Sequence, residues 1–61
     1  SKENDTIERT AKEYYQTITA ATDAYLDNDR VKGYRLVVQS RENATTIEEL
    51  LNQRLSELLD I

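Results

Sequence analysis

Ile7–Tyr25, the stretch IERTAKEYYQTITAATDAY, decides the fold, because its apolar side chains recur at alternating steps of four and three residues. The row consists of Ile7, Ala11, Tyr14, Ile18, Ala21 and Tyr25. This spacing lays one apolar stripe along a helix of about six turns. A second helix must cover that stripe. The rest of the chain offers a matching row, Val37, Ala44, Ile47, Leu51, Leu55 and Leu58.

The boundaries of these helices are indicated by capping and turn-forming residues, because the chain has no proline and a single glycine. Asp5 followed by Glu8 has the spacing of a capping box and predicts a first helix over about 6–26. Asp27-Asn28-Asp29 then favours a turn at 27–29. A second helix is expected over about 30–60, with a possible break near residues 40–45. The sequence therefore predicts an all-α fold, an antiparallel helical hairpin in a single domain, 1–61.

The segment 34–39 admits a second interpretation as a short strand. Tyr34, Leu36 and Val38 alternate with Arg35, Val37 and Gln39, and the segment contains β-branched residues. A helix would then restart at Thr45, where Thr45 and Glu48 form another capping box. A lone strand would need a second chain to pair with, whereas a long helix needs only the stripe already present.

The size of the chain indicates that it needs a partner. A domain of 61 residues buries only about 60% of the surface that its unfolded chain exposes. Small domains usually compensate with disulfides, a metal or association, and this chain has no cysteine and no histidine. We therefore expect self-association to complete a helical bundle.

Charge is distributed unevenly along a chain whose formal net charge is −4. Residues 1–29 carry seven acids and three bases, residues 30–44 four bases and one acid, and residues 45–61 four acids and one base. The basic residues of the middle segment are Arg30, Lys32, Arg35 and Arg41. Next to Tyr34 they could contact single-stranded nucleic acid. Ion pairs with Asp23, Asp27 and Asp29 across the turn would explain the same charges, and the acidic net charge makes nucleic acid an improbable partner.

Residue types that carry out catalysis or hold cofactors are poorly represented. Ser40 and Ser56 have no histidine to activate them. The acids Glu48, Glu49, Glu57 and Asp60 do not have the spacing of a calcium loop. We therefore expect a protein that is not an enzyme, with no catalytic residue, cofactor, metal or small-molecule substrate. No apolar run approaches the roughly 20 residues that cross a bilayer, which predicts a soluble chain without membrane contact.

An antiparallel hairpin closed about Asn28 would leave the leucine-rich end of the second helix extending beyond the first. Uncovered leucines of this kind favour an interface with another chain. The sequence thus predicts a protein-protein interaction or oligomerisation module, whose partner is a second copy in a homodimer or another helical protein. The expected interface residues are Leu50, Leu51, Leu55, Leu58, Leu59, Tyr15 and Tyr34. Two alternatives remain, a small dimeric nucleic-acid-binding regulator that uses segment 30–41, and a chaperone or inhibitor-like hairpin that masks an apolar segment of its partner.

Overall fold

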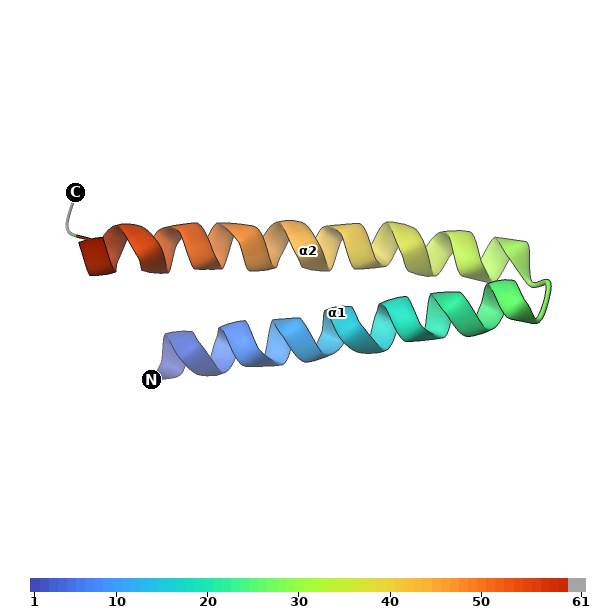
Figure 1. Ribbon diagram of the computed structural model, residues 1–61, viewed down its shortest axis with the longest axis horizontal. Helices are drawn as coiled ribbons and strands as arrows, with labels where there is room; N and C mark the ends of the chain where they lie inside the picture. The colour runs from blue at the N-terminus through green and yellow to red at the C-terminus, as the bar shows by residue number, and fades with distance from the viewer. Residues whose placement is uncertain (60–61) are drawn as a thin grey trace.

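A computed structural model describes residues 1–59, which form two antiparallel helices joined by a short turn (Figure 1). Helix α1 spans Lys2–Leu26 and helix α2 spans Arg30–Leu59. The all-α helical hairpin predicted from the sequence is confirmed. The expected end of the second helix near residue 60 lies outside the described residues.

The beginning of α1 differs from the prediction by four residues. The helix begins at Lys2, because the Ser1 hydroxyl caps it by accepting a hydrogen bond from the Asn4 backbone N–H at 3.1 Å. The Asp5 backbone N–H already donates to the Ser1 carbonyl at 3.0 Å, so Asp5 lies within the helix and is not its cap. Glu3 and Asp5 then place negative charge in the first turn, where it interacts favourably with the helix dipole.

The turn occupies residues 27–29, the segment in which the sequence places it. Asn28 has a φ of 61°, a left-handed conformation that asparagine tolerates better than most residues. The Asn28 N–H donates to the Tyr25 carbonyl at 3.0 Å and the Asp29 N–H donates to the Ala24 carbonyl at 2.8 Å. These two hydrogen bonds form a Schellman motif. Asp29 also begins α2, because its carboxylate accepts a hydrogen bond from the Lys32 N–H at 3.2 Å.

Helix α2 is continuous, so both the strand at 34–39 and the break near 40–45 are wrong. The Thr45 hydroxyl, which the sequence predicts as the cap of a new helix, bonds instead within the existing helix by donating to the Arg41 carbonyl at 3.0 Å. The Ser40 hydroxyl donates in the same way to the Val37 carbonyl at 2.7 Å. Each hydroxyl is thereby satisfied without interrupting the backbone ladder.

The contact between the helices is made by small residues, which we call the seam. The buried members are Thr10, Thr17, Ala21, Ala24, Gly33 and Ser40. The predicted stripe is therefore only partly in the contact: Ala21 belongs to the seam and Ile18 is half-buried, whereas Ala11, Tyr14 and Tyr25 are exposed. Small side chains allow two helix backbones to approach closely, whereas a tyrosine ring between them would hold them apart. The buried hydroxyls of Thr10 and Ser40 bond to carbonyls of their own helix, which reduces the cost of burying them.

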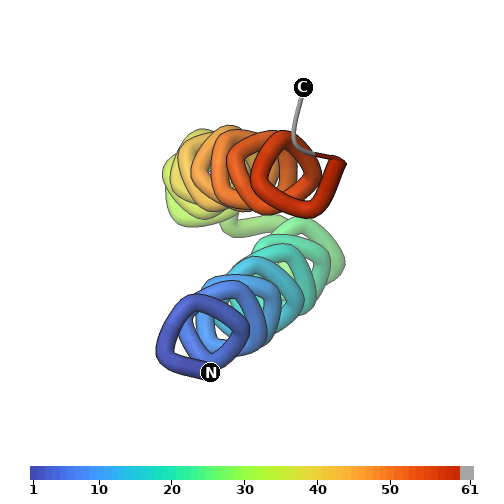
Figure 2. The backbone as a smooth tube through the Cα atoms, turned by 90° about the vertical axis from the view of Figure 1, so that its left-hand side faces the viewer, coloured from blue at the N-terminus to red at the C-terminus, as the bar shows by residue number. Residues whose placement is uncertain are grey.

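The spacing of the two helices changes along the hairpin. Figure 1 and Figure 2 show that they lie close together beside the turn and draw apart toward the open end. Beside the turn, a Cβ atom on Gly33 would lie only 2.9 Å from ring carbons of Tyr25. At the open end the larger side chains of Ile7 and Leu50 are half-buried. The register is marked by Arg54, which lies opposite Glu3 at 3.3 Å.

Candidate interaction surface

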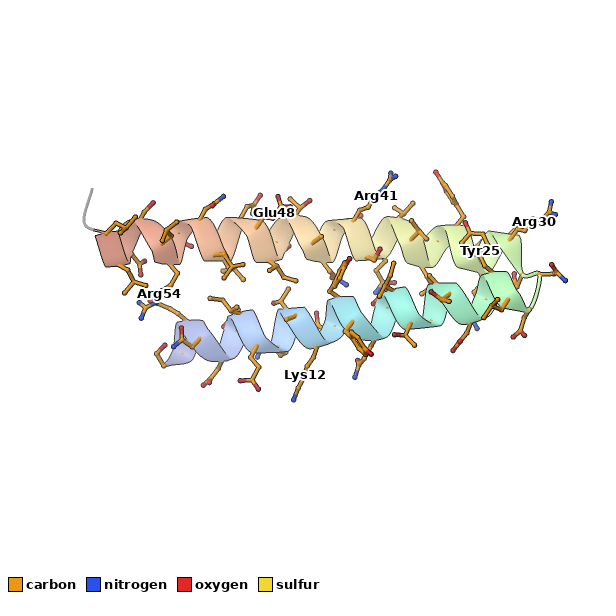
Figure 3. All side chains as sticks on the ribbon, in the orientation of Figure 1. Lys12, Tyr25, Arg30, Arg41, Glu48 and Arg54 are labelled. Carbon is orange, nitrogen blue, oxygen red and sulfur yellow. The ribbon has the colours of Figure 1, made fainter. Side chains whose placement is uncertain are left out.

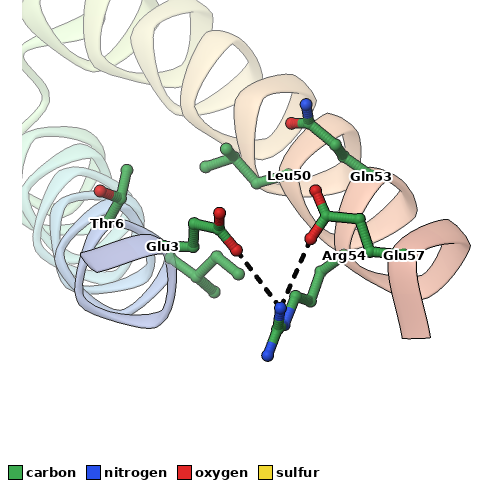
Figure 4. A pocket seen from close by; sticks show the side chains of 7 residues that line it. Glu3, Thr6, Leu50, Gln53, Arg54 and Glu57 are labelled. Atoms are coloured by element: carbon green, nitrogen blue, oxygen red, sulfur yellow. Dashed lines mark hydrogen bonds and ion pairs between the residues drawn. The ribbon is translucent and has the colours of Figure 1, made fainter. Parts of the chain in front are cut away.

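One broad side of the hairpin is polar and contains a pocket at the open end. The pocket has a volume of about 160 Å³ and is lined by Glu3, Thr6, Ile7, Leu50, Gln53, Arg54 and Glu57. Arg54 reaches across it, with one guanidinium nitrogen 3.3 Å from a carboxylate oxygen of Glu3 and 3.4 Å from one of Glu57 (Figure 4). All three of these side chains are partly exposed, so water screens the two ion pairs.

The pocket shows how the two helices are oriented about the seam. Seam positions recur every seven residues, at Thr10, Thr17 and Ala24 on α1 and at Gly33, Ser40, Ile47 and Arg54 on α2. Thr6 lies four residues before the seam position Thr10 of α1. In α2, Leu50 lies four residues and Gln53 one residue before the seam position Arg54. Because these three line one pocket, residues four and one before the seam lie on the same side in both helices. Residues one and four after the seam must then lie together on the opposite side.

That opposite side carries mainly apolar residues, and we call it the apolar face. It consists of Ala11, Tyr14, Ile18 and Tyr25 from α1, and of Tyr34, Val37, Ala44, Leu51, Leu55 and Leu58 from α2. Ile7 is half-buried beside the seam, where it borders both this face and the pocket. The exposure of the apolar face is considerable: Leu51 is 50% exposed, Leu55 53%, Leu58 66% and Tyr34 64%. Arg30, Arg41 and Glu48 are the charged residues that lie within the row of α2. A group of exposed leucines, with further apolar residues on the same face, is typical of an interaction site.

The interface residues expected from the sequence divide into three groups. Leu51, Leu55, Leu58 and Tyr34 lie on the apolar face, and Leu59 is exposed at its edge. Leu50 is half-buried and lines the pocket on the polar side, so it belongs to the contact within the hairpin. Tyr15 is exposed on the outer surface of α1, beside a shallow hollow that includes Ala11 and Lys12.

The period of the apolar residues predicts that Tyr14, Ile18 and Tyr25 lie between the helices, whereas Tyr14 and Tyr25 are exposed and Ile18 is half-buried. A signal was available in the row of small residues at Thr10, Thr17 and Ala24, which has the same seven-residue period. A stripe of small residues lets helices approach more closely than a stripe of large ones, and that difference selects the seam.

The basic segment forms no single patch. Arg30 and Arg41 lie on one side of α2, whereas Lys32 and Arg35 lie nearly opposite, as their spacing along a helix requires. The expected ion pairs with Asp23, Asp27 and Asp29 are not formed, since within residues 1–59 both ion pairs belong to Arg54. One physical reason is that Asp29 is engaged in capping α2.

Sites for chemistry are sparse in the part of the chain that the structure describes. The Ser40 hydroxyl is buried and bonded to a carbonyl of its own helix. Residues 1–59 contain no group of three or more side chains that could hold a metal ion. Neither helix, over the same residues, has a stretch long and apolar enough to span a membrane.

Comparisons of this chain with protein-family models, with curated proteins and with solved structures found no match. Its candidate site is therefore defined by geometry alone, as an apolar face made by both helices of the hairpin.

Proposed function

We propose that this chain is a non-enzymatic association module whose apolar face binds another helical surface. The observation that supports this proposal is the exposed group of Leu51, Leu55 and Leu58 at the open end, on the same face as the exposed Tyr14, Tyr25 and Tyr34. Burial of this face would give the hairpin the large apolar contacts that its seam does not contain.

The weakness of the seam supports the same proposal. Its buried apolar side chains are those of Ala21 and Ala24, and no large side chain within residues 1–59 is fully buried. Hydrophobic stabilisation is roughly proportional to the apolar area removed from water, so alanines contribute little of it. A hairpin of this kind gains most of its stability when a partner covers the leucines. Each of Leu51, Leu55 and Leu58 would then contribute about 1 kcal/mol, because half or more of its surface is still exposed.

The proposal predicts that unfolding depends on protein concentration. The midpoint of thermal unfolding, followed by circular dichroism, should rise with concentration for the unmodified chain, because association stabilises the folded state by mass action. Leu55→Lys places a charge on the apolar face and should remove most of that dependence. Gln39→Lys adds the same charge at an exposed position on the polar side and should leave the dependence intact.

A midpoint that does not change with concentration, in a chain that is fully helical, would contradict the proposal. Such a hairpin would be stable with its apolar face exposed and would have no need of a partner. Loss of the concentration dependence in both lysine variants would equally contradict the assignment of this particular face.

A further inference from the structure

We propose that the apolar face is covered by a second copy of this chain, with the two α2 helices antiparallel and the two-fold axis level with residues 44 and 45. This inference rests on the proposed function and adds to it the identity and the orientation of the partner. It is argued from charge complementarity, from the match of apolar positions and from the area of the face.

The charges of α2 favour an antiparallel pair. On the apolar face, Arg30 and Arg41 lie in the half of α2 nearer the turn, and Glu48 lies in the other half. An antiparallel arrangement centred between these halves lays the basic half of one copy against the acidic half of the other. A parallel arrangement would instead lay like charges together, which is unfavourable in an interface.

Arg41 and Glu48 locate the axis more closely. They are the charged residues in the middle of the row of α2 that begins at Arg30, and Figure 3 shows both toward the edge of α2 that faces away from α1. Arg41 and Glu48 are separated along the sequence by the same number of residues from the point between residues 44 and 45. Two-fold symmetry about that point brings Arg41 of each copy opposite Glu48 of the other and forms the same pair twice.

The apolar positions match about the same axis. Tyr34 lies opposite Leu55 of the second copy, and Val37 lies opposite Leu51 within one residue. The exposed leucines at the open end of one hairpin are thereby covered by the turn half of the other. Ala44, a small residue next to the axis, allows the two α2 helices to approach closely.

Helix α1 provides an independent check of this arrangement. Because Arg54 lies opposite Glu3, the point between residues 44 and 45 is level with residues 12 and 13 of α1. Symmetry about that level places Ile7 opposite Ile18 of the second copy. It also places Ala11 opposite Tyr14, so that a small side chain meets a large one. The axis chosen from the charges on α2 thus produces apolar contacts along α1 as well.

The outline of the hairpin is of the size that a stable dimer needs. The Cα atoms extend over 48 Å by 19 Å in the plane of the two helices, so a rectangle of about 900 Å² bounds the face. A standard protein-protein interface buries roughly 800 Å² on each partner.

Charge reversal tests this orientation. In the Arg41→Glu variant, positions 41 and 48 would both be acidic, so acids of one copy would face acids of the other. In the Glu48→Arg variant both positions would be basic, so bases would face bases. Each variant alone should therefore dimerise at least about tenfold more weakly than the unmodified chain in sedimentation equilibrium. An equimolar mixture of the two variants should recover the affinity of the unmodified chain, because every pair is again of opposite charge.

Arg35→Glu and Glu49→Arg are matched controls, since they make the same changes on the outer surface of α2. They should change the dimer affinity no more than about threefold. A dimer that is equally tight in all four variants, or a mixture that does not recover, would overturn the proposed orientation and leave the association proposal standing.

A chain that stays monomeric at every concentration would overturn the second copy as the occupant. Helix content then separates the two proposals. A weakly helical monomer would agree with an association module that folds onto a different helical protein, whereas a fully helical monomer would contradict the proposed function as well.

Discussion

At the scale of single residues, the contact of Gly33 with Tyr25 sets how closely the helices approach beside the turn. Glycine in a helix costs about 1 kcal/mol relative to alanine, so its presence at a buried position calls for a steric reason. The reason here is that a Cβ atom would lie 2.9 Å from the Tyr25 ring. The stability gained from a better helix former would be lost in displacing that ring.

Gly33→Ala is therefore expected to leave the free energy of unfolding unchanged or lower it, measured in urea at fixed protein concentration. In a Tyr25→Ala background the same substitution should raise it by about 0.5–1 kcal/mol, because only the gain in helix propensity remains. An equal effect in both backgrounds would show that Tyr25 does not restrict this position.

At the scale of the helices, the small residues of the seam determine which face of each helix is buried. Ala21 is 1% exposed, and a larger side chain there would have to push α2 away. Ala21→Leu should lower the free energy of unfolding by about 1–3 kcal/mol despite its greater apolar area. Gln16→Leu, at an exposed position, should change it by less than about 0.5 kcal/mol. Urea denaturation of both variants measures the difference, and a stabilising Ala21→Leu would mean that the seam has spare volume.

The helices themselves could be predicted from the sequence, but their exact contact could not. The period of the apolar residues, the Asp27-Asn28-Asp29 turn and the absence of proline suffice for an antiparallel hairpin. The same period fits a seam through Ile18 and a seam through Thr17, which are adjacent positions. A count of apolar residues favours Ile18. The structure instead buries Thr17, because close approach of the backbones depends on side-chain size. The Thr17 hydroxyl accepts a hydrogen bond from the Asn43 side-chain amide of α2 at 3.5 Å.

At the scale of the whole molecule, the broad polar side and the broad apolar side give the hairpin two different surfaces. The sequence analysis located much of the apolar face, in Leu51, Leu55, Leu58 and Tyr34. The period of the apolar residues places Tyr14 and Tyr25 between the helices, because the side on which a residue lies depends on the position of the seam. A difference of one position turns a helix by about 100°, which moves Ala11 and Tyr14 from the contact to the surface.

A cysteine introduced at position 44 tests the dimer as a whole, because the chain has no cysteine of its own. Ala44→Cys lies next to the proposed axis and should form a disulfide-linked dimer under mild oxidation, since disulfide formation requires Cβ atoms within about 4.5 Å. Non-reducing electrophoresis measures the linked fraction. Gln39→Cys, on the polar side, should link much more slowly, and equal rates for the two would contradict the proposed interface.

The close packing beside the turn also affects how the hairpin opens. The end of α1 and the beginning of α2 are separated by only a few residues. Contacts among Ala24, Gly33 and Tyr25 therefore close a short loop at little entropic cost. Folding should begin at this end and proceed toward Glu3 and Arg54, and backbone amides near the turn should exchange with deuterium most slowly. The open end would separate first, so the leucines there could leave one partner and meet another while the turn half stays folded.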